Sequence, residues 1–112
     1  LLLQSSGVGN LPNALAARKE CGFPLFLLVT MRGEEGEFNP WQLPMGGAAP
    51  RVLETMGVEV RRCSQAADVV REAEEGLEAA FRDEVAVAVL VAQSFLGVKS
   101  FRLQAGQEGA PS

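Results

Sequence analysis

Two polar segments hold most of the residues whose types and spacing could do chemistry. The first runs from Gln4 to Asn10 (QSSGVGN) and combines hydroxyl, amide and glycine residues. Its glycines permit a tight turn and close approach of the backbone to a ligand, and a helix that follows would offer unpaired N–H donors. A plainer interpretation is a turn whose Asn10 caps that helix. Pro12 excludes a GxGxxG fingerprint, and the lack of a following Gly-Lys-Ser/Thr excludes a P-loop.

The second segment is the polar loop expected over Met31–Met45, which carries one Arg, three Glu, one Asn and one Gln. It is longer than the usual connection of about 4–6 residues, and such loops are often functional. Arg32 could clamp an anionic group with its planar fork. Alternatively, Arg32 pairs with Glu34 or Glu35 at a solvated surface. Trp41 is interpreted as a packing anchor rather than as a stacking partner for a ligand.

Composition excludes several other kinds of site. The chain has no His, and its two cysteines, Cys21 and Cys63, stand far apart, so a Cys/His zinc site, a Ser-His-Asp triad and a Cys-His dyad are excluded within it. A Cys21–Cys63 disulfide is possible by count, but two reduced, half-buried thiols in a cytoplasmic protein are the favoured reading.

Charge and hydropathy exclude two further classes of partner. The formal net charge is -4 and the Lys and Arg residues are not clustered, which disfavours nucleic acid and anionic membranes. The longest apolar run, Val85 to Ala92, is far shorter than the roughly 20 residues of a membrane-spanning helix. The apolar start at Leu1 is interpreted as a truncation inside a structured element.

The elements that must position these segments alternate along the chain. Continuously apolar runs predict buried strands of a parallel sheet, and the stretches between them have helical periodicity. The strands are expected at Leu1–Gln4, Pro24–Thr30, Val58–Arg62 and Val85–Ala92, and the helices at Asn10–Lys19, Gly47–Met56 and Gln65–Arg82. This order predicts a three-layer α/β domain over residues 1–94, a parallel sheet flanked by helices, followed by a tail over 95–112. Ligands of such sheets bind outside the carboxyl ends of the strands, where both polar segments fall.

The helix expected at Gln65–Arg82 has the clearest pattern. Ser64 is its expected N-cap. One stripe is apolar and consists of Ala66, Val69, Val70, Ala73, Leu77, Ala80 and Phe81. The opposite side carries mostly acids, which predict a solvated face without chemistry.

The two polar segments also carry a family resemblance. The combination of SSGxGNxxNAL with MRGExGExNPxQxPMG is specific. The resemblance as a whole extends over roughly Leu1 to Ala92. The chain resembles the thiamine-diphosphate-dependent decarboxylases that act on sulfopyruvate and phosphonopyruvate. It is most similar to their pyrimidine-binding (PYR) domain, which is the alpha subunit where the enzyme is split.

The resemblance implies a carboxy-lyase subunit that is incomplete on its own. In this family the PYR domain binds the aminopyrimidine of thiamine diphosphate, and a PP domain of a partner (beta) chain binds the diphosphate through Mg²⁺ with a Gly-Asp-Gly motif. No Gly-Asp-Gly occurs in this sequence, so no metal ligand is expected in this chain. The family's activating Glu is expected upstream of Leu1. A non-catalytic interaction or regulatory relative and an unrelated flavodoxin-like binding domain are the alternatives.

Residue by residue, the resemblance and the loop positions give seven candidate site residues. The expected contacts of the cofactor pyrimidine are Ser6, Gly7, Gly9 and Asn10. The expected contacts of the 2-oxo-acid substrate are Arg32, Asn39 and Gln42, because an arginine suits a sulfonate, a phosphonate or a carboxylate.

Overall fold

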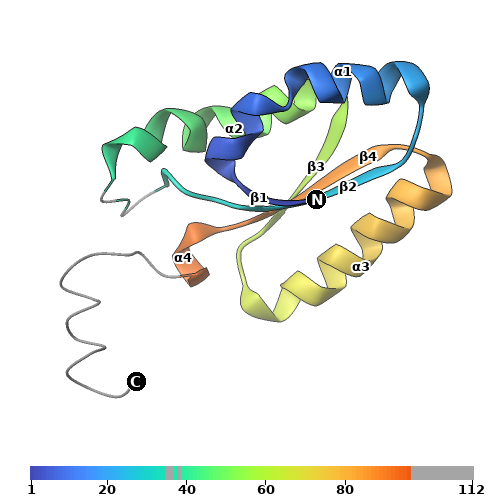
Figure 1. Ribbon diagram of the computed structural model, residues 1–112. Coiled ribbons are helices and arrows are strands. Elements are labelled where there is room, and N and C mark those ends of the chain that lie inside the picture. Colours follow the sequence, from blue (N-terminus) through green and yellow to red (C-terminus); the bar gives the residue numbers. More distant parts are fainter. Residues whose placement is uncertain (35–36, 38, 97–112) are drawn as a thin grey trace.

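The computed structural model describes residues 1–34, 37 and 39–96, which form an α/β domain (Figure 1). Four strands alternate with helices, as the sequence predicts. The elements are β1 (Leu2–Gln4), the 3-10 helix η1 (Ser5–Asn10), α1 (Pro12–Cys21), β2 (Leu25–Thr30), the 3-10 turn η2 (Pro40–Gln42), α2 (Leu43–Thr55), β3 (Val58–Cys63), α3 (Ala66–Asp83), β4 (Ala86–Val91) and α4 (Gln93–Leu96).

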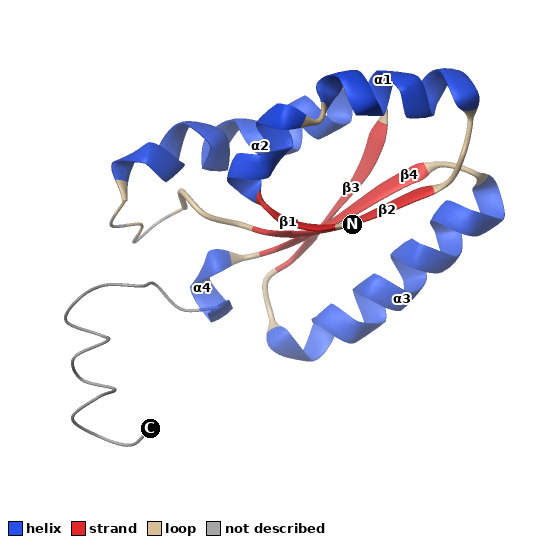
Figure 2. Ribbon diagram, in the orientation of Figure 1, coloured by secondary structure: helices blue, strands red, loops and turns tan. Residues whose placement is uncertain are grey.

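The four strands form one sheet in the order β1-β2-β4-β3, and every pairing is parallel. Helices α1 and α2 cover one face and α3 covers the other (Figure 2). The three-layer α/β arrangement expected from the sequence is therefore confirmed, and it is consistent with a PYR-type domain.

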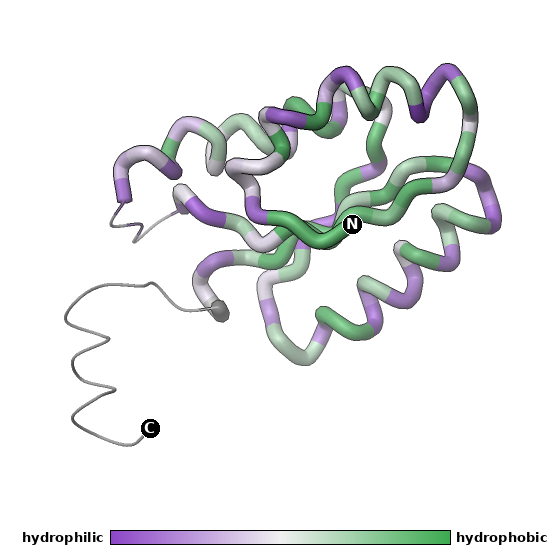
Figure 3. Tube along the Cα trace, viewed as in Figure 1, coloured by the Kyte–Doolittle hydropathy of each residue, from purple (hydrophilic) through white to green (hydrophobic). Residues whose placement is uncertain are grey.

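Strand β4 lies between β2 and β3, and all six of its residues are buried. A strand covered on both faces needs apolar side chains in both directions, which explains its continuous run of alanine, valine and leucine. The hydropathy colouring shows this apolar centre, with mixed polarity along α3 (Figure 3). The larger core cluster lies between the sheet and the α1/α2 layer and includes Leu15, Leu27, Val29 and Leu53.

The polar loop after β2 is shorter than predicted. The turn η2 begins at Pro40, and α2 begins at Leu43 rather than near Gly47. Pro44 fits this earlier start because the first helical turn tolerates a residue without an N–H. Trp41 is 88% exposed, so its interpretation as a packing anchor is wrong.

Two expected helix caps are also wrong. Asn10 ends η1, and the N-cap of α1 is Leu11, whose side chain has no hydrogen-bonding group. The backbone of Leu11 is already helical, so η1 continues almost directly into α1 and leaves little need for a side-chain cap. For α3 the N-cap is Gln65 rather than Ser64, and its carbonyl accepts from the Asp68 amide.

The apolar stripe predicted for α3 faces the sheet only in part. Val70, Leu77 and Phe81 are 66%, 45% and 63% exposed. The contact with the sheet is made by two residues of that stripe, Val69 and Ala80, and by the buried Gly76 outside it. Small residues let the helix backbone approach the sheet closely, and the bulkier side chains are displaced to its flank.

Both cysteines are free, so the disulfide alternative is wrong. Cys21 is exposed and Cys63 is buried, rather than both being half-buried. Helix α4 extends to Leu96, two residues into the segment predicted as a tail, and residues 97–112 lie outside the described part of the chain. Within the described residues, no helix is both long enough and apolar enough to cross a bilayer.

Candidate functional site

The turn after β1 and the loop after β2 are joined by one serine. Ser5 is fully buried at the carboxyl end of β1. Its hydroxyl accepts a hydrogen bond from the Arg32 amide at 3.0 Å and lies 3.2 Å from the Arg32 carbonyl, to which it donates. Both backbone groups of Arg32 are thus fixed by the neighbouring strand end.

Glu37 is the centre of the loop after β2, and its side chain is fully buried. Oε1 accepts from Arg32 Nε, the Gly33 amide and Gln93 Nε2, each at 2.9 Å. Oε2 accepts from Arg32 Nη2 at 2.8 Å and from the backbone N–H of Asn39 at 3.2 Å. Five donors saturate a carboxylate that has about four lone-pair sites.

The hydrogen bonds from Arg32 lower the pKa of Glu37 to about 2, against burial, which raises it. The Gly33 and Asn39 amides and the Gln93 side chain lower that pKa further. In turn, the hydrogen bonds to Glu37 raise the pKa of Arg32. Both groups are therefore ionised at neutral pH, and they form a bidentate ion pair.

Gln93 and Glu34 extend this network to the other strand ends. Gln93 follows the end of β4 after one intervening residue, Ala92, and is buried. The backbone N–H of Gln93 donates to Glu34 Oε1 at 2.9 Å, and the side-chain Oε1 of Gln93 accepts from the backbone N–H of Glu34 at 3.1 Å. Glu34 Oε2 pairs with Arg62 near the end of β3. The network therefore connects the carboxyl ends of β2, β4 and β3.

Two glycines allow the loop to lie directly on the first turn of α2. Gly33 has a φ of 73°, and a Cβ there would lie 1.9 Å from the Gln42 carbonyl oxygen. A Cβ on Gly46 would lie 2.2 Å from the Arg32 carbonyl oxygen. Since both contacts are with backbone, a rotamer change cannot relieve them, and the loop is packed as tightly as a core element.

The four predicted cofactor residues lie on η1. Ser6, Gly9 and Asn10 are exposed, and Gly7 is half-buried. Val8 between them is fully buried and anchors the element.

The glycines of η1 also have a packing role. A Cβ on Gly7 would lie 3.3 Å from the Leu3 side chain, and one on Gly9 would lie 3.6 Å from the Met45 side chain. Met45 belongs to the first turn of α2, so η1 and the loop after β2 both rest against that turn. The structure therefore brings the two predicted polar segments together.

The three predicted substrate residues have different surroundings. Arg32 is paired with Glu37, and Glu34 pairs with Arg62, so the surface pair of Arg32 with Glu34 considered from the sequence is wrong; Glu35 lies outside the described residues. The Asn39 side chain accepts from the Trp41 amide at 3.1 Å. The side-chain oxygen of Gln42 is buried and has no hydrogen-bond partner among the described residues.

Sequence reasoning missed three residues that organise this site: Ser5, Glu37 and Gln93. Ser5 and Glu37 lie within the two polar segments, but nothing in residue type distinguishes them from their exposed neighbours. Gln93 had a usable signal, because it is the first strongly polar residue after the apolar run of β4 and so falls at a strand carboxyl end.

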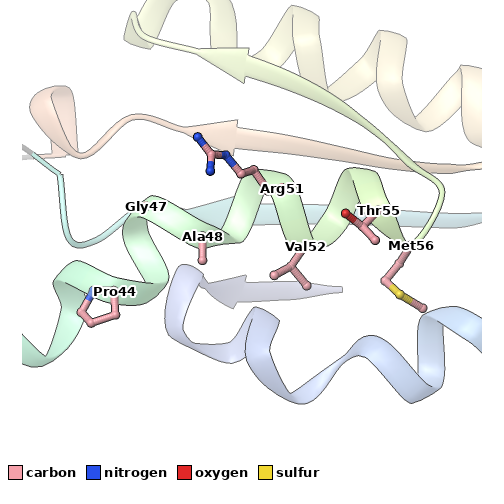
Figure 4. A pocket seen from close by; sticks show the side chains of 7 residues that line it. All are labelled: Pro44, Gly47, Ala48, Arg51, Val52, Thr55 and Met56. Carbon is pink, nitrogen blue, oxygen red and sulfur yellow. The ribbon is translucent and has the colours of Figure 1, made fainter.

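A separate depression of about 440 Å³ lies along α2 (Figure 4). Its lining residues, within the described part of the chain, include none of the predicted site residues. They are Pro44, Gly47, Ala48, Arg51, Val52, Thr55 and Met56. The described residues also contain no group of three or more His, Cys, Asp or Glu side chains arranged to bind a metal ion.

Two curated proteins are similar to this chain. The alpha subunit of sulfopyruvate decarboxylase from Methanothermobacter thermautotrophicus is 34% identical over 96 residues, which is 85% of this chain and 58% of that subunit. A sulfopyruvate decarboxylase from Methanosarcina acetivorans is 39% identical over 59 residues, which is 52% of this chain and 15% of that protein. No family model and no solved structure matches the chain.

The chain thus spans a little over half of the alpha subunit that it matches. A match over 96 residues, 85% of this chain, includes most of the described domain. The resemblance read from the two polar segments is confirmed: the chain is a relative of the sulfopyruvate decarboxylases, similar over most of its length to their alpha subunit.

Proposed function

We propose that this chain is the PYR domain, or part of it, of a thiamine-diphosphate-dependent 2-oxo-acid decarboxylase of the sulfopyruvate or phosphonopyruvate type. The observation that carries the proposal is the pair of Ser5–Arg32 hydrogen bonds. These bonds hold the two polar segments side by side at the carboxyl ends of parallel strands, where ligands of open α/β sheets bind.

The exposed groups of η1 fit the aminopyrimidine of the cofactor. Ser6 and Asn10 present a hydroxyl and an amide, which are neutral groups that both donate and accept hydrogen bonds, as a neutral aminopyrimidine requires. Their exposure suits a ring shared with a second chain. In this proposal Ser6, Gly7, Gly9 and Asn10 hold that ring, and the bound cofactor supplies the electron sink for loss of CO₂.

The loop after β2 binds and orients the substrate. Arg32 contributes a fixed positive charge, and Asn39 and Gln42 contribute amides. The buried oxygen of Gln42, which no described residue satisfies, fits a donor on a ligand or a bound water, because buried polar atoms are nearly always paired. These side chains orient the 2-oxo acid and neutralise its charge.

The rest of the active site belongs to a partner. A PP-domain (beta) subunit or domain provides the Mg²⁺ and diphosphate site, which is consistent with the alpha-subunit name of the first relative. A cytoplasmic location is part of the same proposal, supported by two free cysteines.

The test is reconstitution. The full-length protein is co-expressed with its PP-domain partner and supplied with thiamine diphosphate and Mg²⁺. Release of CO₂ is then measured from sulfopyruvate, phosphonopyruvate and pyruvate. Turnover of at least one substrate supports the proposal. A folded complex that turns over none of them refutes it and favours a non-catalytic relative.

The site assignment is tested in the same assay. Asn10→Ala and Arg32→Ala should each lower kcat/KM. Glu59→Gln, at an exposed ion pair with Arg61, should leave it unchanged. If Asn10→Ala and Arg32→Ala both behave like the wild type, the assignment of these two residues is wrong.

A further inference from the structure

The ion pair in the loop uses only one edge of the Arg32 guanidinium. Glu37 takes Nε and Nη2 in a side-on arrangement. A guanidinium carries five N–H groups in a fixed planar fork, so this arrangement uses two and leaves three. The remaining three belong to Nη1 and to the outer side of Nη2. One N–H of Nη1 and the outer N–H of Nη2 form the end-on edge, whereas the other N–H of Nη1 points back toward Cδ. The described residues provide no hydrogen bond to Nη1.

Glu37 is itself immobilised by the fold. Its carboxylate is bound by the Gly33 and Asn39 amides and by Gln93, in addition to Arg32. The plane of the guanidinium is therefore set before any ligand arrives, and the rotamer entropy of Arg32 is already lost. The Arg32 side chain retains 17% of its exposure, whereas Glu37 retains none.

We infer that Glu37 is a positioning residue, which presents the end-on edge of Arg32 as a two-pronged donor for the terminal oxyanion of the substrate. This inference rests on the proposed function and deepens it. The terminal oxyanion is a sulfonate or phosphonate, the group that distinguishes such substrates from pyruvate. Two oxygens of a tetrahedral oxyanion match the spacing of two guanidinium N–H groups, as in arginine–phosphate pairs.

Charge balance favours directed donors over a general positive field. Within the network two arginines, Arg32 and Arg62, are matched by two carboxylates, Glu34 and Glu37. Substrate recognition here therefore depends on the orientation of N–H groups, and a lysine cannot replace the arginine. The three donors of a lysine ammonium rotate about one nitrogen and form no fixed planar fork, so they cannot present one edge to Glu37 and a second edge to an oxyanion.

The experiment compares three variants with the wild type in the reconstituted complex: Glu37→Gln, Arg32→Lys and the surface control Glu59→Gln. KM and kcat are measured separately with sulfopyruvate and with pyruvate, the latter as substrate or as inhibitor. Glu37→Gln and Arg32→Lys should raise the KM for sulfopyruvate by about tenfold or more, the loss expected for hydrogen bonds to a charged group. Binding of pyruvate and the kcat should change little, and Glu59→Gln should match the wild type.

A second readout is independent of turnover. Sodium methanesulfonate should raise the Tm of the wild-type complex above that in equimolar sodium chloride, because it binds the folded state. It should not raise the Tm of Arg32→Lys. If no substrate is turned over but this difference is seen, the proposed function fails while the oxyanion site stands.

Three results would overturn the inference. In the first, Arg32→Lys retains the wild-type KM for sulfopyruvate. In the second, sulfopyruvate and pyruvate are affected equally, which is the signature of a merely structural role. In the third, methanesulfonate stabilises the wild type no more than Arg32→Lys. Should Glu37→Gln fail to fold, as judged by circular dichroism, the folded Arg32→Lys variant still decides between these outcomes.

Discussion

The turn after β1 and the loop after β2 are both polar and both follow the carboxyl end of a strand, yet they are built on opposite principles. In the loop after β2, charged groups bind one another and the backbone, and Glu37 is fully buried. In the turn after β1, the backbone forms a 3-10 helix anchored by Ser5 and Val8, and the polar side chains of Ser6 and Asn10 remain exposed. Polar composition alone therefore does not show which side chains are available to a ligand.

The contrast has a consequence for mutation. Substitution of a polar residue in the loop after β2 should lower the free energy of unfolding, because it leaves a buried partner without its hydrogen bond. The exposed polar residues of η1, Ser6 and Asn10, should affect stability little. Four experiments test this difference, in order of decreasing expected effect.

The largest effect is expected where the loop lies on α2. Gly46→Ala places a Cβ 2.2 Å from the Arg32 carbonyl oxygen, so the loop or the helix must move. We expect a loss of about 3 kcal/mol or more in the free energy of unfolding, measured by urea denaturation. The neighbouring Gly47→Ala meets nothing within 4 Å and should gain up to about 1 kcal/mol from helix propensity. Equal effects of the two variants would show that the loop is not tightly packed.

The second effect concerns the ion pair. Glu37→Gln removes the charge that Arg32 faces and puts an amide donor against the guanidinium. Breaking a buried pair on one side costs about 3–5 kcal/mol, and we expect about 2–3 because Arg32 is partly exposed. The control Glu59→Gln, at an exposed pair with Arg61 of the same 2.8 Å length, should change stability by less than about 0.5 kcal/mol. If both variants lose less than about 0.5 kcal/mol, the Arg32–Glu37 pair contributes no more to stability than an exposed ion pair.

The third effect is a pH dependence. The pKa of Glu37 is lowered from 4.5 to about 2 in the folded protein. Its contribution to stability is therefore present above pH 4.5 and is lost as the pH falls toward 2, because the unfolded state then binds the proton more tightly. The Tm of the wild type should decline more steeply over this range than that of Glu37→Gln. If Tm falls with pH equally in the two proteins, the lowered pKa of Glu37 is contradicted.

The smallest effect compares adjacent serines. Ser5→Ala removes both hydrogen bonds to Arg32 and should cost about 1–2 kcal/mol in the free energy of unfolding. Ser6→Ala changes an exposed side chain and should alter stability by less than about 0.5 kcal/mol. Chemical denaturation of the two variants measures both values. The comparison between the two regions fails if Ser6→Ala is the more destabilising of the pair.

The sequence predicted the layers of the fold well and its local details less well. The apolar run Val85–Ala92 is short and rich in valine, which favours a strand buried on both faces over a buried helix, so the sheet could be predicted. The caps predicted at Asn10 and Ser64 are wrong because backbone geometry, rather than a side chain, completes those helix starts. On α3, periodicity identified an apolar stripe, but it could not show that the sheet is contacted through small residues such as Gly76.

The candidate site was predicted as two segments but not as a network. Spacing placed both segments at strand carboxyl ends, and the structure joins them through Ser5. Which glutamate pairs with Arg32 depends on the three-dimensional course of the loop: Glu37 does, whereas the nearer Glu34 pairs with Arg62. Gln93 is distant in sequence and meets the loop only because β4 lies beside β2.

The position of β4 also governs the order in which the domain can assemble during synthesis. It is the last strand of the described chain, yet it is the only link between β2 and β3. Among the described strands, a nascent chain that ends before Ala86 has an apolar β2 paired only with the short β1, and a β3 without a neighbour. Such contacts between distant segments make folding slow and leave strand edges open to aggregation. The ribosome must therefore release β4 before β2 and β3 can join in one sheet, and low temperature or chaperone co-expression should improve the soluble yield.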